Sequence, residues 1–234
     1  MGAEPVPGAG KGRGAVSNPP GRFRERVSEA VDDGWYREQA VPVSIATEVR
    51  PEAARRIVNR NDSPDVPFDY SINPYRGCEH GCVYCYARPA HAYVDLSPGL
   101  DFETRLFYKQ DAAGLLRRAL SSGRYQGSSI AIGGNTDAYQ PIERDLEVTR
   151  SLLKVLREFR QPFSIVTKGS LILRDLDILQ EMAGRGLCRV FVSVTTLDSE
   201  LKRIMEPRTA SPAARLRTIP VSYTHLTLPT NREV

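Results

Sequence analysis

The sequence predicts an α/β fold in which parallel strands are covered by helices. Between residues 128 and 205, short apolar runs alternate with stretches whose apolar residues recur at helical spacing. Each run is almost entirely apolar, which is typical of parallel strands that are buried on both faces. Strands that alternate with helices in this way form βα units, and the chain from Phe68 onward contains about four of them.

The first predicted strand lies within Phe68–Gly77, whose sequence is FDYSINPYRG. A loop with three cysteines follows directly, and a helix is expected to begin between Cys85 and His91. The second strand lies within residues 128–137, because this apolar run ends in two glycines, as a buried strand before a tight turn would.

The second helix has apolar residues at helical spacing between Leu146 and Phe159, with Asp145 as its N-cap. The third strand lies within residues 162–169, and the helix after it is closed by Gly184 and Gly186.

The fourth strand is predicted within residues 188–196, and its helix begins at Asp198. The core is therefore expected to cover residues 67–219. Residues 220–234 do not continue the pattern and resemble the translation of a sequencing-library adapter. We expect them to be a non-native tail on a C-terminally truncated barrel, and assign no role to His225.

Residues 1–66 are predicted to lie outside the core. Residues 1–34 are rich in Gly and Pro and read as a disordered basic arm, and a polar connector follows up to residue 66. A solvated tail is favoured over a nucleic-acid contact for this arm. Its basic residues are Lys11, Arg13, Arg22, Arg24 and Arg26.

The composition is that of an ordinary globular protein. Of the 234 residues, 41% are hydrophobic and 26% are charged, so the chain can bury a core. No run of about 18 apolar residues is present to span a bilayer, and the N-terminus lacks the apolar centre of a secretory signal. We therefore expect a cytoplasmic protein with no membrane contact.

Three of the four cysteines, Cys78, Cys82 and Cys85, lie in the loop RGCEHGCVYCYARP. A disulfide framework is disfavoured, because such frameworks distribute their pairs and Cys188 lies far away in an apolar strand, as a core cysteine would. A zinc site remains open, with His80 or His91 as the fourth ligand. Three thiolates on one loop are better matched to a [4Fe-4S] cluster whose fourth iron stays open.

The run CEHGCVYC resembles the signature loop of the radical SAM superfamily. Together with GGNTDAYQPIE, VTKGSLILRDLDIL and VSVTTLD, it resembles a bacterial subfamily related to spore photoproduct lyase, over residues 68–219. The resemblance implies a partial (βα) barrel of the radical SAM type. It also implies that the three loop cysteines bind a [4Fe-4S] cluster that cleaves S-adenosylmethionine to a 5′-deoxyadenosyl radical.

The resemblance further implies an electron donor such as flavodoxin or ferredoxin, and a substrate that is unknown, with nucleic acid as one class. A lyase of that kind would carry a hydrogen-donating cysteine near the barrel mouth, and Cys188 opens its strand at the opposite end. The alternative is a non-catalytic iron-sulfur electron-transfer or zinc-binding module.

Six further residues are implied to bind the S-adenosylmethionine cofactor. Backbone carbonyls of the glycine turn would accept from its ammonium group, although this chain has an amide where the family commonly has an acid. A tyrosine in the cysteine loop would pack near the adenine, and two hydroxyls after the fourth strand would meet the ribose. These residues are Gly133, Gly134, Asn135, Tyr84, Ser193 and Thr195.

Three charged or titratable residues are weaker candidates. Lys168 or Arg208 would pair with the methionine carboxylate, although a solvated surface charge is the commoner role for such residues. His80 lies inside the cysteine loop, where it is expected to orient the loop or tune the cluster by hydrogen bonding rather than to ligate iron.

Overall fold

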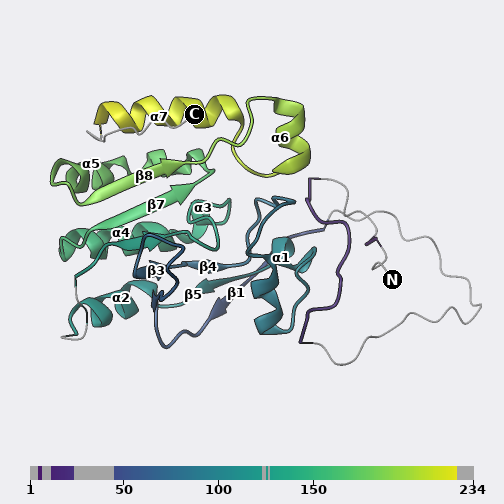
Figure 1. Ribbon diagram of the computed structural model, residues 1–234, viewed down its shortest axis with the longest axis horizontal. Coiled ribbons are helices and arrows are strands. Elements are labelled where there is room, and N and C mark those ends of the chain that lie inside the picture. Colours follow the sequence, from purple (N-terminus) through teal and green to yellow (C-terminus); the bar gives the residue numbers. More distant parts are fainter. Residues whose placement is uncertain (1–4, 7–11, 24–44, 123–124, 126, 226–234) are drawn as a thin grey trace, which may run out of the picture.

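The computed structural model describes residues 5–6, 12–23, 45–122, 125 and 127–225, and it is an α/β fold with two sheets (Figure 1). The larger sheet has five strands in the order β2-β3-β6-β7-β8. Its strands are β2 Val58–Arg60, β3 Tyr70–Ile72, β6 Ile130–Ile132, β7 Phe163–Thr167 and β8 Cys188–Val192.

The four strands predicted from the sequence form the parallel part of this sheet. β3, β6, β7 and β8 are parallel neighbours, each within the range expected for it, while β2 adds an antiparallel edge. β7 and β8 point toward the end of the molecule that carries α1 and α6 (Figure 1). The carboxyl ends of the parallel strands, where barrel enzymes place their chemistry, therefore meet at that end.

The smaller sheet was missed by the sequence prediction. It contains β1 Glu48–Glu52, β5 Arg105–Lys109 and β4 Tyr75–Arg76 in the order β1-β5-β4. Since β1 and β2 both lie before residue 67, the expected boundary of the core is too late. The physical reason is that the β1 sequence EVRPE alternates charged and apolar residues on a largely exposed strand, so it lacks the apolar run of a buried one.

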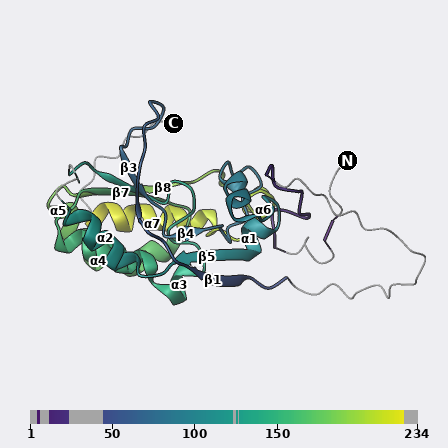
Figure 2. The same cartoon turned by 90° about the horizontal axis from the view of Figure 1, so that it is seen from below.

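Helices are present where three of the four were predicted, the first predicted helix is a short 3-10 helix, and the helices Ala112–Leu120 and Pro212–His225 were not predicted. α2 Ala112–Leu120, α4 Val148–Glu158, α5 Leu176–Gly184 and α7 Pro212–His225 pack successively against one another, and Figures 1 and 2 both show α2, α4 and α5 together at the end opposite α1 and α6. The shorter helices are η1 Arg88–Val94, α1 Asp101–Thr104, α3 Glu143–Leu146, η2 Ser170–Asp175 and α6 Ser199–Met205.

The core lies between the larger sheet and these helices. Strand residues Phe163 and Ile165 are 2% and 0% exposed, and Leu152 and Leu156 of α4 are fully buried against them. The buried residues recur every second position in the strand and every third or fourth position in the helix, which are the apolar periods that predicted both. No described helix has both the length and the apolar character needed to cross a membrane.

The helix caps agree with the sequence in two places and differ in one. Asp198 caps α6, because its Oδ1 accepts hydrogen bonds from the amides of Glu200 at 2.7 Å and Leu201 at 3.0 Å. Gly186 (φ 70°) follows the end of α5, as expected. The Asp145 cap is wrong, since Asp145 lies within α3 and a different side chain caps α4.

That side chain is Glu143, which is 0% exposed. Its carboxylate accepts from the first free amides of α4, those of Thr149 at 2.9 Å and Arg150 at 3.2 Å. The sequence predicted one continuous helix that starts here. Instead, Glu147 adopts a left-handed backbone conformation (φ 49°), which separates α3 from α4.

The two ends of the chain also differ from expectation. α7 continues to His225, so the proposed boundary of the tail at residue 220 falls inside a helix, and residues 226–234 lie outside the described residues. The arm predicted to be disordered lies partly outside them as well, at residues 1–4, 7–11 and 24–34, as does the start of the polar connector up to residue 44. Residues 12–23 are described, and Arg13 among them is only 9% exposed.

Candidate functional site

The cysteine loop runs from β4 to η1 at the end of the molecule that carries α1 and α6. Cys78 and Cys82 are buried at 7% and 9% exposure, Cys85 is half-buried, and all three are free thiols. Positive φ angles at Gly77 (78°) and Gly81 (66°) place glycine at positions that side chains disfavour, one before each of the first two cysteines. The loop is anchored where the Cys78 amide donates to the Phe102 carbonyl at 2.9 Å.

The three thiols lie near one another on the loop. Burial raises the pKa of Cys82 to about 12, and the nearby Cys78 and Cys85 add to this effect while Lys168 opposes it. Burial also raises the pKa of Cys85, with a further contribution from Cys78. Since each thiolate would disfavour the next, the trio needs a compensating cation to hold all three in the charged form.

The fourth cysteine lies elsewhere, as predicted. Cys188 is 2% exposed at the start of β8, where it pairs with Phe163 and belongs to the main core cluster. Burial raises the pKa of Cys188 to about 12, and no charged group of the described residues contributes to this shift. Cys188 is therefore remote from the trio.

Neither histidine considered as a fourth ligand completes a metal site. Within the described ranges, no group of three or more His, Cys, Asp and Glu side chains is arranged to hold a metal ion. His91 is fully buried, its Nε2 lies 2.9 Å from the Arg105 carbonyl oxygen, and its ring packs against those of Phe102 and Phe107. The finding that no such group is arranged among the described residues includes the three loop thiols, so it is their spacing along the chain that matches the donor set of a cluster with one open iron.

His80 forms a buried ion pair that ties the loop to the sheet. Its Nδ1 lies 3.3 Å from Oδ2 of Asp137, and both side chains are less than 10% exposed. Burial would lower the pKa of His80, but the Asp137 carboxylate and the Cys78 sulfur overcome it and raise that pKa to about 10. Burial works against the ionised form of Asp137 too, yet the pairing with His80 lowers the pKa of Asp137 to about 2.

Asp137 was not singled out from the sequence. It also accepts hydrogen bonds from the Thr167 hydroxyl at 2.6 Å and the Lys168 amide at 2.7 Å, which joins the glycine turn to the end of β7. The available signal was its position in GGNTD, three residues after the second glycine that ends the β6 turn.

The glycine turn follows β6 directly. Gly133 has φ 85°, and a Cβ there would lie 3.0 Å from the Val166 carbonyl oxygen, so the backbone approaches β7 too closely for most side chains. The Gly134 carbonyl accepts a hydrogen bond from the hydroxyl of Tyr86 in the cysteine loop. The structure therefore brings the glycine turn and the loop together.

Tyr84 belongs to a second network that the sequence did not reveal. Its hydroxyl donates to the carboxylate of Glu206 and lies 3.2 Å from Oγ1 of Thr195. Thr195 donates to Glu206 at 2.7 Å, and Arg215 of α7 forms a buried ion pair with the same carboxylate. Burial would raise the pKa of Glu206, but the bonds from Tyr84, Thr195 and Arg215 lower it.

The chain matches the family description "Radical SAM superfamily" over residues 72–221. It belongs to this superfamily. An uncharacterized protein of Mycobacterium tuberculosis (strain ATCC 25618 / H37Rv) is 41% identical over 154 residues, which are 66% of this chain and 45% of that protein. An uncharacterized protein of Methanocaldococcus jannaschii is 29% identical over 170 residues, 73% of this chain and 60% of that one.

The fold of this radical SAM chain also resembles solved structures. Spore photoproduct lyase complexed with dinucleoside spore photoproduct matches with a TM-score of 0.53 and 17% sequence identity, over 76% of this chain and 48% of the lyase. The likeness shows a shared radical SAM fold. The chain spans about half the length of the lyase and of the mycobacterial relative.

The remaining candidate residues divide into two groups. Residues of the first group lie near the cysteine loop. Ser193 and Thr195 follow β8 as expected, and the Ser193 amide donates to the Thr167 carbonyl at 2.9 Å. The Nζ of Lys168 lies 5.8 Å from the centre of the Tyr84 ring. Arg208 instead pairs with Glu79 at 3.0 Å. Lys168 thus acts on Cys82 and Cys85, and Arg88 acts on Cys85 as well.

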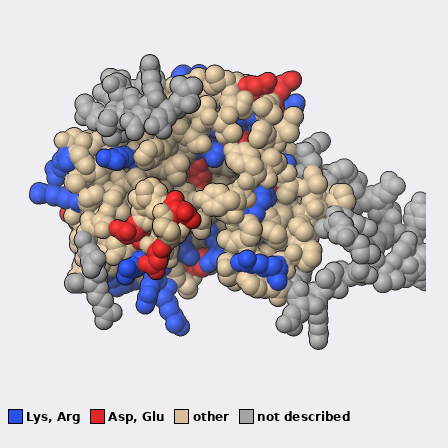
Figure 3. Space-filling model, viewed as in Figure 1, with Lys and Arg blue, Asp and Glu red and all other residues tan. Residues whose placement is uncertain are grey.

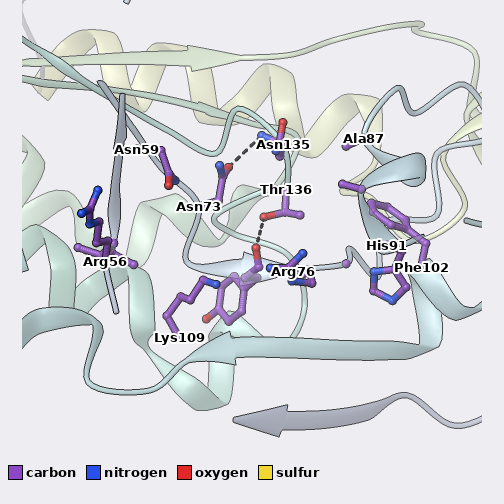
Figure 4. Close-up of a pocket in the computed structure, with 14 residues that line it drawn as sticks. Arg56, Asn59, Asn73, Arg76, Ala87, His91, Phe102, Lys109, Asn135 and Thr136 are labelled. Carbon is purple, nitrogen blue, oxygen red and sulfur yellow. Dashed lines mark hydrogen bonds between the residues drawn. The ribbon is translucent and has the colours of Figure 1, made fainter. Parts of the chain in front are cut away.

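A pocket of about 170 Å³ lies behind the cysteine loop of this radical SAM chain (Figure 4). Three cations, Arg56, Arg76 and Lys109, line it together with the amide side chains of Asn59, Asn73 and Asn135. His91 lies at its other end, beside Phe102 and Ala87, and its Nδ1 is a buried atom without a hydrogen-bond partner among the described residues.

Charges of both signs alternate over the face shown in Figure 3, where Lys and Arg do not gather into one basic patch. Two cations of the pocket are already partly neutralised, because Glu52 accepts from Arg76 at 2.9 Å and from Lys109 at 2.6 Å. Glu52 therefore offsets one of the three positive charges that line the pocket.

Proposed function

We propose that this chain is part of an enzyme that binds a [4Fe-4S] cluster through Cys78, Cys82 and Cys85 and cleaves S-adenosylmethionine reductively. The observation that carries the proposal is the thiol trio. Its members are free, lie on one loop and lie near one another, while the fourth thiol is in the core. When bound, the cluster would supply the electron that splits the sulfonium bond.

The residues around the trio would hold the cofactor and exclude water. The Gly133 and Gly134 carbonyls would accept from the methionine ammonium, with Asn135 adding a neutral contact in place of an acid. Lys168 would pair with the methionine carboxylate, because it lies beside the thiols and Arg208 is engaged by Glu79.

Tyr84 and Thr195 are held together by Glu206, so both would form the wall beside the adenosine. Ser193 would contact the ribose hydroxyls from the end of the neighbouring strand. His80 would orient the cysteine loop from its ion pair with Asp137, as proposed from its place between Cys78 and Cys82.

The test is anaerobic reconstitution with iron and sulfide, followed by reduction with dithionite and addition of S-adenosylmethionine. We expect a reducible [4Fe-4S] signal and the appearance of 5′-deoxyadenosine. In cells the electron would come from a small carrier such as flavodoxin or ferredoxin. A chain that takes up zinc instead, or forms a cluster yet never yields deoxyadenosine in the longer relatives either, would be a non-catalytic metal or electron-transfer module.

We propose nucleic acid as the substrate class, because the pocket behind the loop concentrates three cations and three amides. The matched lyase was solved with a dinucleoside photoproduct, which gives this class a precedent in a related fold. The lyase reaction itself is not proposed: three of the four cysteines would bind the cluster and Cys188 is in the core.

Binding of a single-stranded oligonucleotide at several salt concentrations tests this class. Removing one phosphate contact by Arg56→Gln should weaken binding and lower the slope of log K against log salt by about 0.7. Arg55→Gln is the matched control, since Arg55 is also exposed but does not line the pocket. Equal weakening by both substitutions would assign the binding to general surface charge.

A further inference from the structure

We propose that residues 12–19, here called the N-terminal strap, are part of the cluster-binding unit and position the segment that carries Cys82. The inference rests on the proposed function for its meaning, but the contacts that carry it are independent of any cluster. The strap lies beside α1, at the same end of the molecule as the cysteine loop (Figure 1).

Arg13 fixes the strap to the body of the protein. Its guanidinium is 9% exposed and donates to the Glu103 carbonyl at 3.0 Å, the Ile45 carbonyl at 2.9 Å and the Thr47 hydroxyl at 3.0 Å. Thr47 in turn donates to Glu79 at 2.7 Å, and Glu79 lies between Cys78 and His80. A solvated tail would not bury a guanidinium in a set of specific acceptors.

Glu103 gathers the strap and the loop at one carboxylate. It is 0% exposed, and it accepts from the strap amides of Gly14 at 3.0 Å and Ala15 at 2.8 Å. The same carboxylate accepts from Arg88 at 2.6 Å. A buried carboxylate needs several donors of this kind, and the strap supplies two of the amides that bond to Glu103.

Arg88 links Glu103 to the cysteine loop by hydrogen bonds. Its Nη2 and Nε donate to the carbonyl of Cys82 at 2.9 Å and 3.2 Å. The strap is thus connected to a cluster cysteine through two charged side chains, Glu103 and Arg88, each fixed by more than one hydrogen bond. Because both partners are charged and largely buried, small displacements at one end cost energy at the other.

The strap also touches the loop directly. A Cβ added at Gly14 would lie 1.7 Å from the carbonyl oxygen of Gly81, so the two backbones meet where no side chain fits. Gly81 has φ 66°, and a Cβ there would lie 2.7 Å from the Glu103 carboxylate. Since Gly81 directly precedes Cys82, a shift of the strap moves the sulfur of Cys82.

The far end of the strap is fixed as well. The Ser17 carbonyl accepts from the Leu100 amide at 3.1 Å, and the Ser97 hydroxyl donates to the Pro19 carbonyl at 2.6 Å. With both ends held, the strap covers the outer side of the loop as a fixed layer. Arg13 and Gly14 are therefore positioning residues for Cys82.

The test compares Gly14→Ala and Arg13→Ala with Val16→Ala, a matched control on the same strap whose side chain is 49% exposed. In the reduced, cluster-free chain, the alkylation rate of each cysteine by iodoacetamide is measured by mass spectrometry. We expect Cys82 to react roughly tenfold faster in Gly14→Ala and Arg13→Ala, through local opening, with Cys188 unchanged. Val16→Ala should match the parent chain, and Arg13→Lys should recover part of the protection.

Unchanged Cys82 rates would overturn the proposal, as would Cys82 and Cys188 rates that rise together, which would show general destabilisation. A second measurement follows the reduced cluster by electron paramagnetic resonance after reconstitution, where Gly14→Ala should shift the signal and speed the loss of cluster in air. If no cluster forms in the parent chain, the proposed function fails while the alkylation rates still decide the role of the strap.

Discussion

The cysteine loop and the N-terminal strap are adjacent layers that use their chemistry in opposite ways. The loop carries its chemistry in side chains, three of which are thiols that lie near one another. The strap makes its contacts mainly through its backbone amides and carbonyls and one buried guanidinium. The comparison teaches that side chains supply the donor atoms of the proposed site, whereas main-chain groups of a neighbouring segment hold those side chains in position.

The largest expected effect separates loop thiols from the core thiol. Cys82→Ala should abolish assembly of the [4Fe-4S] cluster, because two thiolates cannot hold the three irons that the trio would hold. Cys188→Ala should leave cluster assembly intact, since that thiol belongs to the core at the start of β8. Iron and acid-labile sulfide per chain measure both variants, and equal loss in the two would mean that Cys188 is a ligand.

The next effect tests whether the loop and the strap share one centre. Glu103→Ala removes the carboxylate that joins Arg88 to the strap and leaves a largely buried guanidinium without its partner. Breaking a buried pair in this way should lower the free energy of unfolding by about 3–5 kcal/mol. Urea unfolding measures it, with Glu158→Ala as the control, because Glu158 and its partner Arg117 are both about half exposed. A loss no larger than that of the control would mean that Glu103 is not a centre of stability.

The parallel sheet could be predicted from sequence because its residues are dictated by burial. β7 buries every second residue, Phe163, Ile165 and Thr167, and the helices beside it repeat at helical spacing. The smaller sheet could not, since its strands are short or partly exposed and their pairing joins β1 to β5 across more than fifty residues of chain. Nothing local in EVRPE distinguishes a paired strand from a polar connector.

The residues of the candidate site also divide into those that local sequence makes visible and those that only the folded structure brings together. The cysteines and the glycine turn could be proposed from the sequence because thiols at close spacing and paired glycines are unusual wherever they occur. Glu206, Asp137 and Glu103 were missed, because an acidic residue in a sequence is ordinary and becomes informative only when it is buried among donors. Arg13 was read as part of a solvated tail for that reason, and the structure places it at 9% exposure.

Acid should weaken the link between the loop and the sheet. Asp137 has a pKa of about 2, below its ordinary value of 3.8, because of its pairing with His80, so it contributes stability above pH 4 that is lost as the pH falls toward 2. The shift corresponds to about 2 kcal/mol. Urea unfolding of the cluster-free chain between pH 2.5 and 5 should show this decline, and Asp137→Asn should flatten that part of the profile. An identical acid slope in the variant would assign the loss to other carboxylates.

The smallest effect contrasts one cap that the sequence identified with one that it misplaced. Asp198→Ala removes an acceptor from two amides at the start of α6 and should cost about 1 kcal/mol. Asp145→Ala should change the midpoint of thermal unfolding very little, because Asp145 is exposed within α3 and the amides of α4 are bonded to Glu143. If Asp145→Ala proved the more destabilising of the two, α3 and α4 would form one continuous helix in solution. The left-handed conformation of Glu147 would then not be a fixed feature of the fold.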